Sequence, residues 1–380
     1  MRSLPKGAAS QSRCGNGRSQ EFALAADDPA ARGLIVSLPR HAGLTGDEAL
    51  RQGCWVKLIC GASNQDLASI SDLCAVYAAA GVHCVDVAAD SAVVHAARLG
   101  LNCARERTGS SPWLMVSVSD GSDVHFRKAV FDPALCPPDC PRPCERVCPA
   151  DAITADRGVE ASVCYGCGRC LPACPQQLIH AEEHQVGLEG LSQLLQELQP
   201  DALEIHTAPE RSAAFERTLL AVAASQVPLR RLAVSCGLEG HGVTPAVLAR
   251  ELWHRHGALR RQGMRPLWQL DGRPMSGDVG AGTARAALRL WQQLRTIAPP
   301  GPLQLAGGTN DVTISFLQTL DPSVQARPSG VAFGGMARVL LQPLLQQAES
   351  RQISLRDWPS GWQEAVSLAR SLVEPWLQKV

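Results

Sequence analysis

The chain has 380 residues, which is too long for one average domain and suits one large barrel with a small extra module. Lys plus Arg and Asp plus Glu both number 36, so the formal charge is zero and gives no electrostatic reason to expect nucleic acid as a partner. Apolar residues make up 45% of the chain, which allows a sizeable core. No stretch approaches the roughly 20 consecutive apolar residues that span a bilayer.

The first 45 residues form a polar segment that begins MRSLPKGAASQSRCGNGRSQ. This segment is rich in Arg and Ser and lacks the apolar stretch of an export signal, so we expect a cytoplasmic protein. A transit-like segment is the alternative interpretation, but the composition favours a disordered N-terminal extension over residues 1–45.

Three apolar runs follow, and each has the length and the polar or glycine stop of a buried strand. They lie at 55–62, 84–90 and 113–119, and the segments between them, such as 91–100, have the periodicity of helices. We assign residues 46–122 to the first part of a β/α barrel.

Residues 123–185 interrupt this alternation and contain eight of the fifteen cysteines. The second cysteine run reads Cys164-x2-Cys167-x2-Cys170-x3-Cys174 and ends in proline, which is the spacing of bacterial ferredoxins. In that pattern three closely spaced thiolates bind one [4Fe–4S] cluster, and the fourth reaches the other cluster. The sequence therefore predicts a ferredoxin-like module over residues 123–185.

The first cysteine run also ends in Cys-Pro, but its spacers have three residues instead of two. The related sequences CPADAI and CPQQLI after the two runs indicate a duplicated half of a ferredoxin. The crossed ferredoxin pattern then assigns the cysteines to two clusters. Cluster one would use Cys136, Cys140, Cys144 and Cys174, and cluster two would use Cys148, Cys164, Cys167 and Cys170.

Structural zinc is the alternative for these cysteines, because Cys-x2-Cys pairs also bind Zn²⁺ in tetrahedral sites. Zinc ribbons use two separated pairs, whereas this segment has two sets of four cysteines that each end in Cys-Pro. Most of the seven remaining cysteines lie in apolar stretches and are expected to be small buried side chains. A disulfide framework is not expected in a cytosolic chain.

The alternation of strands and helices resumes over residues 186–350. The predicted strands lie at 202–207, 229–238, 266–272, 302–308 and 330–336. Eight strands in all predict a (β/α)₈ barrel, with the ferredoxin-like module inserted after the third strand. A doubly wound open sheet is the alternative, because a count of strands does not prove closure. Residues 351–380 predict a C-terminal helical tail.

Two glycine pairs follow the last two predicted strands, Gly307-Gly308 and Gly334-Gly335. The loops after these strands often bind a phosphate in barrels, so the pairs are candidate contacts for the phosphate of FMN, with Arg338 adding charge. The simpler interpretation is that glycine lets the chain turn where a barrel strand ends.

Polar residues occupy several predicted strands at positions where a side chain would face the barrel interior. Inward polar groups need partners, so a Lys57–Asp86 pair is the structural interpretation and contact with a substrate or a flavin ring is the functional one. Three histidines show no ligand spacing and are expected at the surface, His241, His254 and His256. The inward polar set is Lys57, Asp86, Glu204, His206, Gln269 and Asp271.

Several stretches together resemble the LdpA family, the cyanobacterial light-dependent period modulators. They are WVKLICGASNQDLASI, CVDVAADSAVV, the cysteine segment, DGRPMSGDVGAGT and QLAGGTN, and the resemblance extends over about residues 45–345. It implies a cytoplasmic iron–sulfur protein that senses cellular redox state as a proxy for light and adjusts the circadian period through clock-associated proteins. All eight cluster cysteines carry over from this resemblance, and no catalytic residue does.

Two functional hypotheses remain. A redox sensor would exchange electrons with the quinone or ferredoxin pool, and the change of charge would alter a surface that binds a partner. The alternative is a flavin-dependent oxidoreductase, in which the glycine loops hold FMN and two [4Fe–4S] clusters supply electrons. A scaffold whose clusters serve only folding is a third possibility, and the family resemblance favours the sensor.

Overall fold

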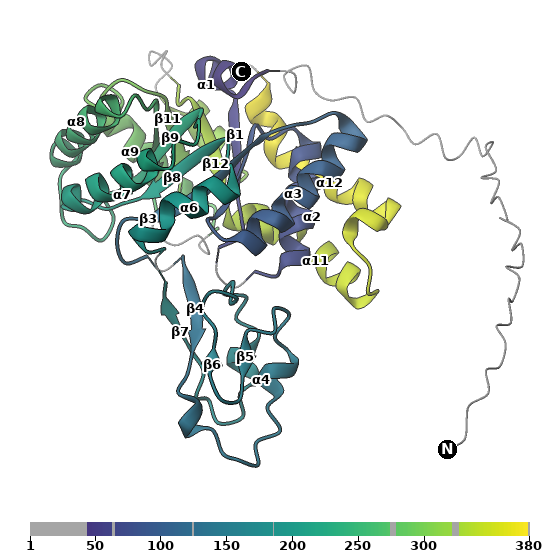
Figure 1. Ribbon diagram of the computed structural model, residues 1–380. Coiled ribbons are helices and arrows are strands. Elements are labelled where there is room, and N and C mark those ends of the chain that lie inside the picture. The colour runs from purple at the N-terminus through teal and green to yellow at the C-terminus, as the bar shows by residue number, and fades with distance from the viewer. Residues whose placement is uncertain are drawn as a thin grey trace, which may run out of the picture. The chain divides into compact units, whose positions relative to one another are not determined.

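A computed structural model describes residues 44–62, 65–123, 125–184, 186–273, 279–320 and 327–378. Eight parallel strands close into a barrel in the order β1-β12-β11-β10-β9-β8-β3-β2, which excludes the doubly wound open sheet (Figure 1). These strands are β1 (Trp55–Ile59), β2 (Cys84–Ala88), β3 (Trp113–Ser119), β8 (Ala202–His206), β9 (Arg231–Gly237), β10 (Pro266–Asp271), β11 (Leu303–Ala306) and β12 (Gly330–Phe333).

All eight predicted strands are confirmed, and each observed strand lies inside its predicted range. The apolar runs locate the strands correctly because parallel barrel strands are covered on both faces. Apart from β3, which fills its predicted range, the observed strands are shorter because ladder pairing ends before the chain turns. The predicted N-terminal extension lies, apart from residues 44 and 45, outside the described residues.

Helices surround the barrel and follow its strands in the alternating order that the sequence predicts. Two helix ends show why: Thr244 accepts a hydrogen bond from Val247 N ahead of Pro245, and Gly81 adopts a left-handed φ of 105°. The outer helices are α2 (Leu67–Ala80), α3 (Ser91–Thr108), α6 (Leu188–Leu198), α7 (Ser212–Ala224), α8 (Pro245–Arg261), α9 (Ala284–Leu294), α10 (Thr313–Gln318) and α11 (Gly335–Ser350).

The helix expected at 91–100 is confirmed and is longer than the expected segment, because α3 continues through Gly100 to Thr108. Gly100 lies where α3 meets α2. A Cβ atom at this position would lie 2.1 Å from the carbonyl oxygen of Ser71, so only glycine allows the two helices to approach this closely.

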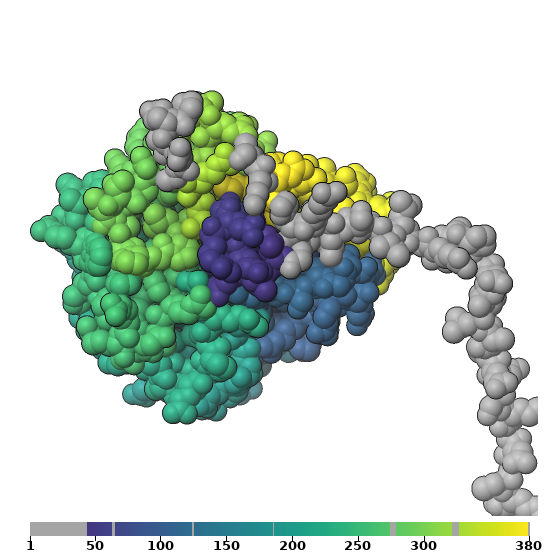
Figure 2. Space-filling model, turned by 90° about the horizontal axis from the view of Figure 1, so that it is seen from above, coloured from purple at the N-terminus to yellow at the C-terminus, as the bar shows by residue number. Residues whose placement is uncertain are grey.

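The N-terminal end of the barrel is covered by the short helix α1 (Gly46–Gln52). A capping box between Thr45 and Glu48 begins this helix. Its buried Ala49 and Leu50 pack in one cluster with Trp55 and other residues from the starts of the strands. Figure 2 shows α1 in the middle of this face, so α1 is the described element that closes the N-terminal end of the barrel.

The C-terminal segment packs on the barrel through α12 (Pro359–Leu377) and the short turn η2 (Leu355–Asp357). Asp72 of α2 accepts hydrogen bonds from Ser354 Oγ, Leu355 N and Arg356 Nε at 2.6–2.9 Å. The helical tail is therefore held against α2. None of the helices that the structure describes is both long and apolar enough to cross a bilayer.

The cysteine segment forms a separate module between β3 and α6 (Figure 1). Two antiparallel strands, β4 (Arg127–Val130) and β7 (His180–Glu183), join it to the barrel, and β5 (Ile153–Thr154) pairs with β6 (Gly158–Val159). The remaining elements are the turn η1 (Pro133–Leu135) and the short helices α4 (Pro143–Arg146) and α5 (Cys170–Ala173). The insertion after the third barrel strand agrees with the sequence prediction.

Candidate functional site

The eight cysteines of the module lie in two groups. In the first group, the pKa of Cys136 is raised by burial and by neighbouring Cys140 and Cys174, and the pKa of Cys144 is raised by burial and by Cys174. Cys174 is the last cysteine of the second run, so residues from both runs meet here.

The second group is arranged around Cys170, at the start of α5. Burial raises the pKa of this thiol to about 11, and Cys167, Cys164 and Cys148 nearby add to the effect. Cys148 closes the first run in the sequence. Cys148 thus neighbours cysteines of the second run, as Cys174 neighbours cysteines of the first, and the crossed assignment of ligands stays a prediction.

Backbone amides lie close to the sulfur atoms of Cys148 and Cys174, the last cysteines of the two runs. The amide N of Ala152 lies 3.3 Å from Cys148 Sγ. Burial would raise the pKa of Cys174, but amides of residues 176–179 donate to its sulfur and lower the pKa overall. Amides directed at sulfur stabilise the thiolate form, which is the form that binds iron.

The internal repeat of the module is visible in the backbone. Asp151 and Gln177 each lie three residues after a Cys-Pro cysteine, and both have a positive φ, 50° and 53°. Gly166 and Gly168, between the cysteines of the second run, also have a positive φ. Glycine at these two positions lets the loop turn around a bound group without a side chain in the way.

The sulfur atoms of the described module cysteines do not form a compact tetrahedral zinc site. A tetrahedral zinc site with Zn–S bonds of about 2.3 Å holds its thiolates roughly 3.8 Å apart. Within the described ranges, which include all eight module cysteines, no three cysteine sulfurs lie within 4.8 Å of one another. A four-iron cluster separates its thiolates further, because each sulfur binds a different iron.

The second cysteine loop contacts the barrel directly. Tyr165 Oη donates to Asp66 Oδ1 at 3.1 Å, and Arg169 Nη2 donates to Asp66 Oδ2 at 2.8 Å. Asp66 is the residue that precedes α2. Tyr165 is 8% exposed and packs in the main hydrophobic cluster of the barrel, so this loop is anchored to the start of a barrel helix.

A network of charged and polar side chains crosses the barrel interior. Lys57 is fully buried, and its Nζ donates to Asp86 Oδ2 at 2.6 Å and to Glu204. The predicted Lys57–Asp86 pair is therefore confirmed, and Glu204 is a second partner. Burial would lower the pKa of Lys57, but the two carboxylates outweigh it and raise the pKa above its usual range.

The pKa values of the two carboxylates are shifted in opposite directions, although both groups pair with the Lys57 ammonium. Burial raises the pKa of Asp86 to about 6. Burial would also raise the pKa of Glu204, but Lys57 and His206 outweigh it and hold the pKa well below its usual range. Gln269 Nε2 donates to Glu204 Oε1 at 2.7 Å, which fixes the second oxygen of this carboxylate.

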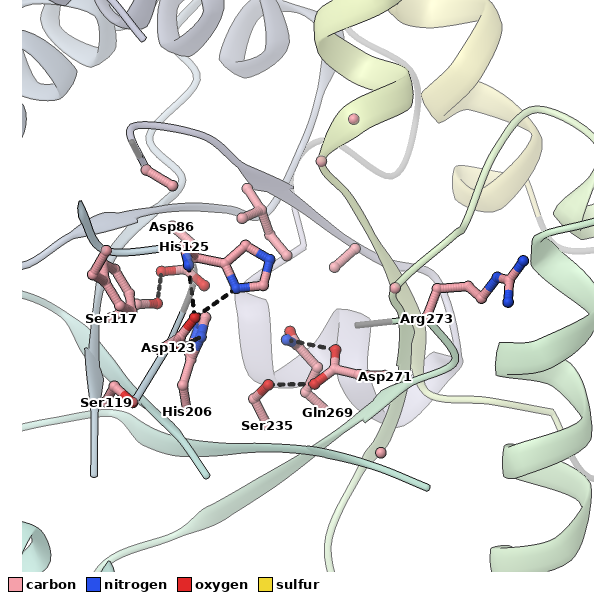
Figure 3. A pocket seen from close by; sticks show the side chains of 18 of the residues that line it. Asp86, Ser117, Ser119, Asp123, His125, His206, Ser235, Gln269, Asp271 and Arg273 are labelled. Carbon is pink, nitrogen blue, oxygen red and sulfur yellow. Dashed lines mark hydrogen bonds and ion pairs between the residues drawn. The ribbon is translucent and has the colours of Figure 1, made fainter. Parts of the chain in front are cut away.

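At the open end of the barrel, His206 lies between two carboxylates. Its Nδ1 is 2.8 Å from Asp123 Oδ2 and its Nε2 is 3.1 Å from Glu204 Oε1. Burial would lower the pKa of His206, but Asp123 and Glu204 outweigh it and raise the pKa well above its usual value. His125 Nδ1 lies 2.7 Å from Asp123 Oδ1, so Asp123 joins two histidines (Figure 3).

Asp271, at the end of β10, lies across the same opening. It accepts hydrogen bonds from Ser235 Oγ and, at 3.2 Å, from Gln269 Nε2. Both partners are neutral, and burial raises the pKa of Asp271 to about 6. Arg273 points away from this group and pairs with Glu239 at 2.6 Å (Figure 3).

These side chains line a cavity of about 370 Å³ at the C-terminal end of the strands. Active sites of β/α barrels lie at this end. The lining includes Asp86, Asp123, His125, His206, Asp271, Arg338 and all four glycines that the sequence singled out, Gly307, Gly308, Gly334 and Gly335.

Close packing explains one glycine pair. A Cβ atom at Gly307 would lie 2.4 Å from the carbonyl oxygen of Arg273, and one at Gly308 would lie 3.0 Å from Thr283 Cβ. Both glycines also have a positive φ, 63° and 86°. Gly334 differs, since the nearest atom to a Cβ there would be 3.7 Å away, which leaves room beside the start of α11.

Sequence reasoning missed several residues of the site. Asp123 and His125 lie in the connection from β3 to β4, where only their spacing of two residues was a signal. Ser117 donates to Asp86 Oδ1 at 2.6 Å, and Gln304 Nε2 donates to Gln269 Oε1 at 2.7 Å. Of the histidines expected at the surface, His256 is partly buried. Residues 274–278 of the loop at 271–283 lie outside the described residues.

Two family models match the chain. Residues 136–185 match the LdpA Fe-S cluster-binding domain, and residues 194–375 match the Light dependent period A C-terminal domain. The fold and the cysteines thus define an iron–sulfur-binding β/α barrel protein.

A curated protein named "Light dependent period A", from Synechococcus elongatus (strain ATCC 33912 / PCC 7942 / FACHB-805), is 47% identical over 337 residues. The match covers 88% of this chain and 94% of that protein. The chain therefore belongs to the Light dependent period A family.

Solved structures share only distant similarity with the chain. The YdjI aldolase of Escherichia coli K12 is 9% identical over 87% of this chain and 94% of its own, with a TM-score of 0.41. The carboxyl transferase domain of Rhizobium etli pyruvate carboxylase is 9% identical, with a TM-score of 0.40, over 86% of this chain and half of that one. Likenesses this distant carry no argument about what the barrel binds.

Proposed function

We propose that this chain takes part in light-dependent control of the circadian period, as the name of its relative indicates, and that it does so as a redox sensor with two [4Fe–4S] clusters. The observation that carries the proposal is the grouping of the eight thiols. Cys136, Cys140, Cys144 and Cys174 would hold one cluster, and Cys148, Cys164, Cys167 and Cys170 would hold the other. A bound [4Fe–4S] cluster supplies one-electron chemistry.

The side chains of the module give this chemistry a route to the barrel. Tyr165 and Arg169 belong to the second cysteine loop, and both hydrogen-bond to Asp66 at the start of α2. A change of charge among the thiolates of this loop alters the field at these bonds, and most of all at the bond of Tyr165, whose side chain is buried. We propose that α2 and the helices packed on it form the surface that responds, with clock-associated proteins as partners and the quinone or ferredoxin pool as the electron source.

Hydrogen exchange tests the readout. The anaerobic full chain is compared in its oxidised and dithionite-reduced states, with exchange measured by mass spectrometry. We expect a change in exchange at the first turn of α2 in the parent, and a much smaller change in Arg169→Ala. Reduction that alters exchange only within residues 125–184 would show that the module does not signal to the barrel.

The role in period control has its own test. Cells of Synechococcus elongatus that lack their own Light dependent period A receive either this chain or its Cys167→Ala variant, and the period is measured at two light intensities. We expect the parent to restore light dependence and the variant to fail. Equal restoration by both would contradict a role for the clusters.

A flavin-dependent oxidoreductase is the second candidate, because the mouth cavity adjoins the start of α11 and has free space at Gly334. Backbone amides at a helix start bind phosphate, and Arg338 also lines the cavity. Against this candidate, packing alone accounts for Gly307 and Gly308. Flavin released by acid from the anaerobically purified protein would support it, and its absence would leave the sensor.

A further inference from the structure

Three side chains with metal-binding groups meet at the mouth of the barrel, apart from the cysteine groups of the module. In the portion that the structure describes, Asp123, His125 and His206 form the one set of three or more His, Cys, Asp or Glu residues whose ligand atoms all lie within 4.8 Å of one another. We infer that this trio binds a divalent transition-metal ion, such as Fe²⁺, Co²⁺ or Zn²⁺, in addition to the iron of the clusters.

The donor set matches this class of ion. Two imidazoles and one carboxylate bind first-row divalent metals, and three protein ligands leave further coordination positions open. Thiolates, which select softer ions and iron–sulfur clusters, are not part of the trio. The trio and the cysteine groups of the module would therefore bind different classes of metal ion.

The surroundings of His206 are those of a metal ligand. Histidines that bind metal usually donate the proton of their second nitrogen to a carboxylate, which fixes the ring and its tautomer. His206 Nε2 lies 3.1 Å from Glu204 Oε1, while Nδ1 faces Asp123. Glu204 is fully buried and held by Lys57 and Gln269, so the ring cannot turn without breaking this network.

Asp123 and His125 are positioned by their own turn. The backbone N of His125 donates to Asp123 Oδ1 at 2.8 Å, so the two residues form a compact unit at the end of β3. The ring centroids of His125 and His206 are 5.9 Å apart. Because β8 supplies His206, the ion would join the connection that leads into the module to the barrel itself.

Two arginines that also line the cavity, Arg211 and Arg273, pair with carboxylates other than Asp123. Arg211 pairs with Asp120 at 3.5 Å and donates to the carbonyl oxygen of Ser122, and Arg273 pairs with Glu239. The trio borders the cavity of about 370 Å³, so the open coordination positions face a space that can hold water or a small ligand with oxygen donors.

The competing explanation is a hydrogen-bonded brace in which protons lie between Asp123 and the two histidines. A binding experiment separates the two. The full chain, purified anaerobically with its clusters, is equilibrated with micromolar free Co²⁺. Bound cobalt and iron are then counted by mass spectrometry, and the cobalt ligands are read by X-ray absorption.

We expect one cobalt per chain beyond the iron, with nitrogen and oxygen ligands and no sulfur. His125→Gln and Asp123→Asn should each weaken cobalt binding at least tenfold while iron content stays at the parent level. His125 is the safer change, because its side chain is 26% exposed. His241→Gln, on the rim of the same cavity, is the matched control and should bind cobalt as the parent does.

Three results would overturn the inference. They are an absence of cobalt binding by the parent, cobalt bound through sulfur, and equal binding by the parent and His125→Gln. None of them depends on the role of the clusters, since iron content is counted separately. A failure of the mouth site is thus distinguishable from a failure of the proposed sensor.

Discussion

The barrel and the module differ in strand length and in the size of their hydrophobic cores. Barrel strands have four to seven residues, and its main core includes large buried side chains such as Trp268 and Trp291. Module strands have two to four residues, and among the described residues the module's hydrophobic cluster has five buried members, of which Cys144 and Cys170 are two. A core this small, made partly of cysteines, is expected to depend on a bound cofactor for its stability.

The largest effect is expected when a ligand of the module is removed. Cys167→Ala should lose about half of the iron and make residues 125–184 sensitive to protease, because metal binding and folding are coupled. Iron analysis and limited proteolysis measure both. Cys60→Ala is the matched control, since Cys60 is a buried cysteine that follows β1. Full iron content in Cys167→Ala, or loss of iron in the control, would show that the two populations of cysteine are divided wrongly.

The barrel should instead respond to a break in its internal charges. Lys57→Met leaves the buried Asp86 and Glu204 without their cation, which should lower the free energy of unfolding by about 3–5 kcal/mol. Denaturant titration followed by tryptophan fluorescence measures this loss. A triple variant that adds Asp86→Asn and Glu204→Gln should recover most of it. A loss below about 1 kcal/mol in Lys57→Met would mean that water reaches this network.

Asp271 should make barrel stability depend on pH. Its pKa of about 6 in the fold exceeds the ordinary 3.8, so its contribution to stability is complete below about pH 4 and is lost as the pH rises through 6. Asp271→Asn cannot ionise, and Ser235 can hydrogen-bond to the amide. The free energy of unfolding of the variant should therefore rise above that of the parent between about pH 4 and 6, and the difference should reach about 3 kcal/mol above that range. Denaturation at several pH values tests this, and a gap that does not change with pH contradicts it.

The smallest effect is expected at the contact between the two regions. Tyr165→Phe removes one hydrogen bond to Asp66, which should cost about 0.5–1.5 kcal/mol and raise hydrogen exchange at the start of α2. Iron content should stay unchanged. Ser162→Ala, which removes a local bond to Glu160 in the same module, is the control and should leave α2 as it is. Faster exchange in both variants would show that the effect is not specific to the contact.

The same contrast explains what the sequence could predict. Each barrel strand is a contiguous apolar run that can be recognised from its own residues, so all eight strands could be predicted. The Lys57–Asp86 pair was also predictable, because a polar residue on a strand with both faces covered needs a partner. That Glu204 shares Lys57 was not predictable, since β8 becomes the neighbour of β3 only when the chain returns from the module and the barrel closes.

The residues at the mouth of the barrel and the strands of the module were harder to predict from the sequence. Asp123 and His125 lie in an irregular connection without periodicity, and their meeting with His206 depends on tertiary structure alone. The pairing of β4 with β7 joins segments on either side of the cysteines, and strands of four residues carry little pattern. Cysteine spacing, by contrast, is strong local information, because the cluster dictates it.

The most direct test of the central claim is the cofactor content of the anaerobically purified full chain. Iron and acid-labile sulfide are measured per chain, and EPR spectra are recorded after reduction with dithionite. We expect four irons and four sulfides for each of two clusters, and the split signals of two reduced [4Fe–4S] clusters close to one another. One cluster per chain, or zinc in place of iron with no EPR signal, would contradict the account.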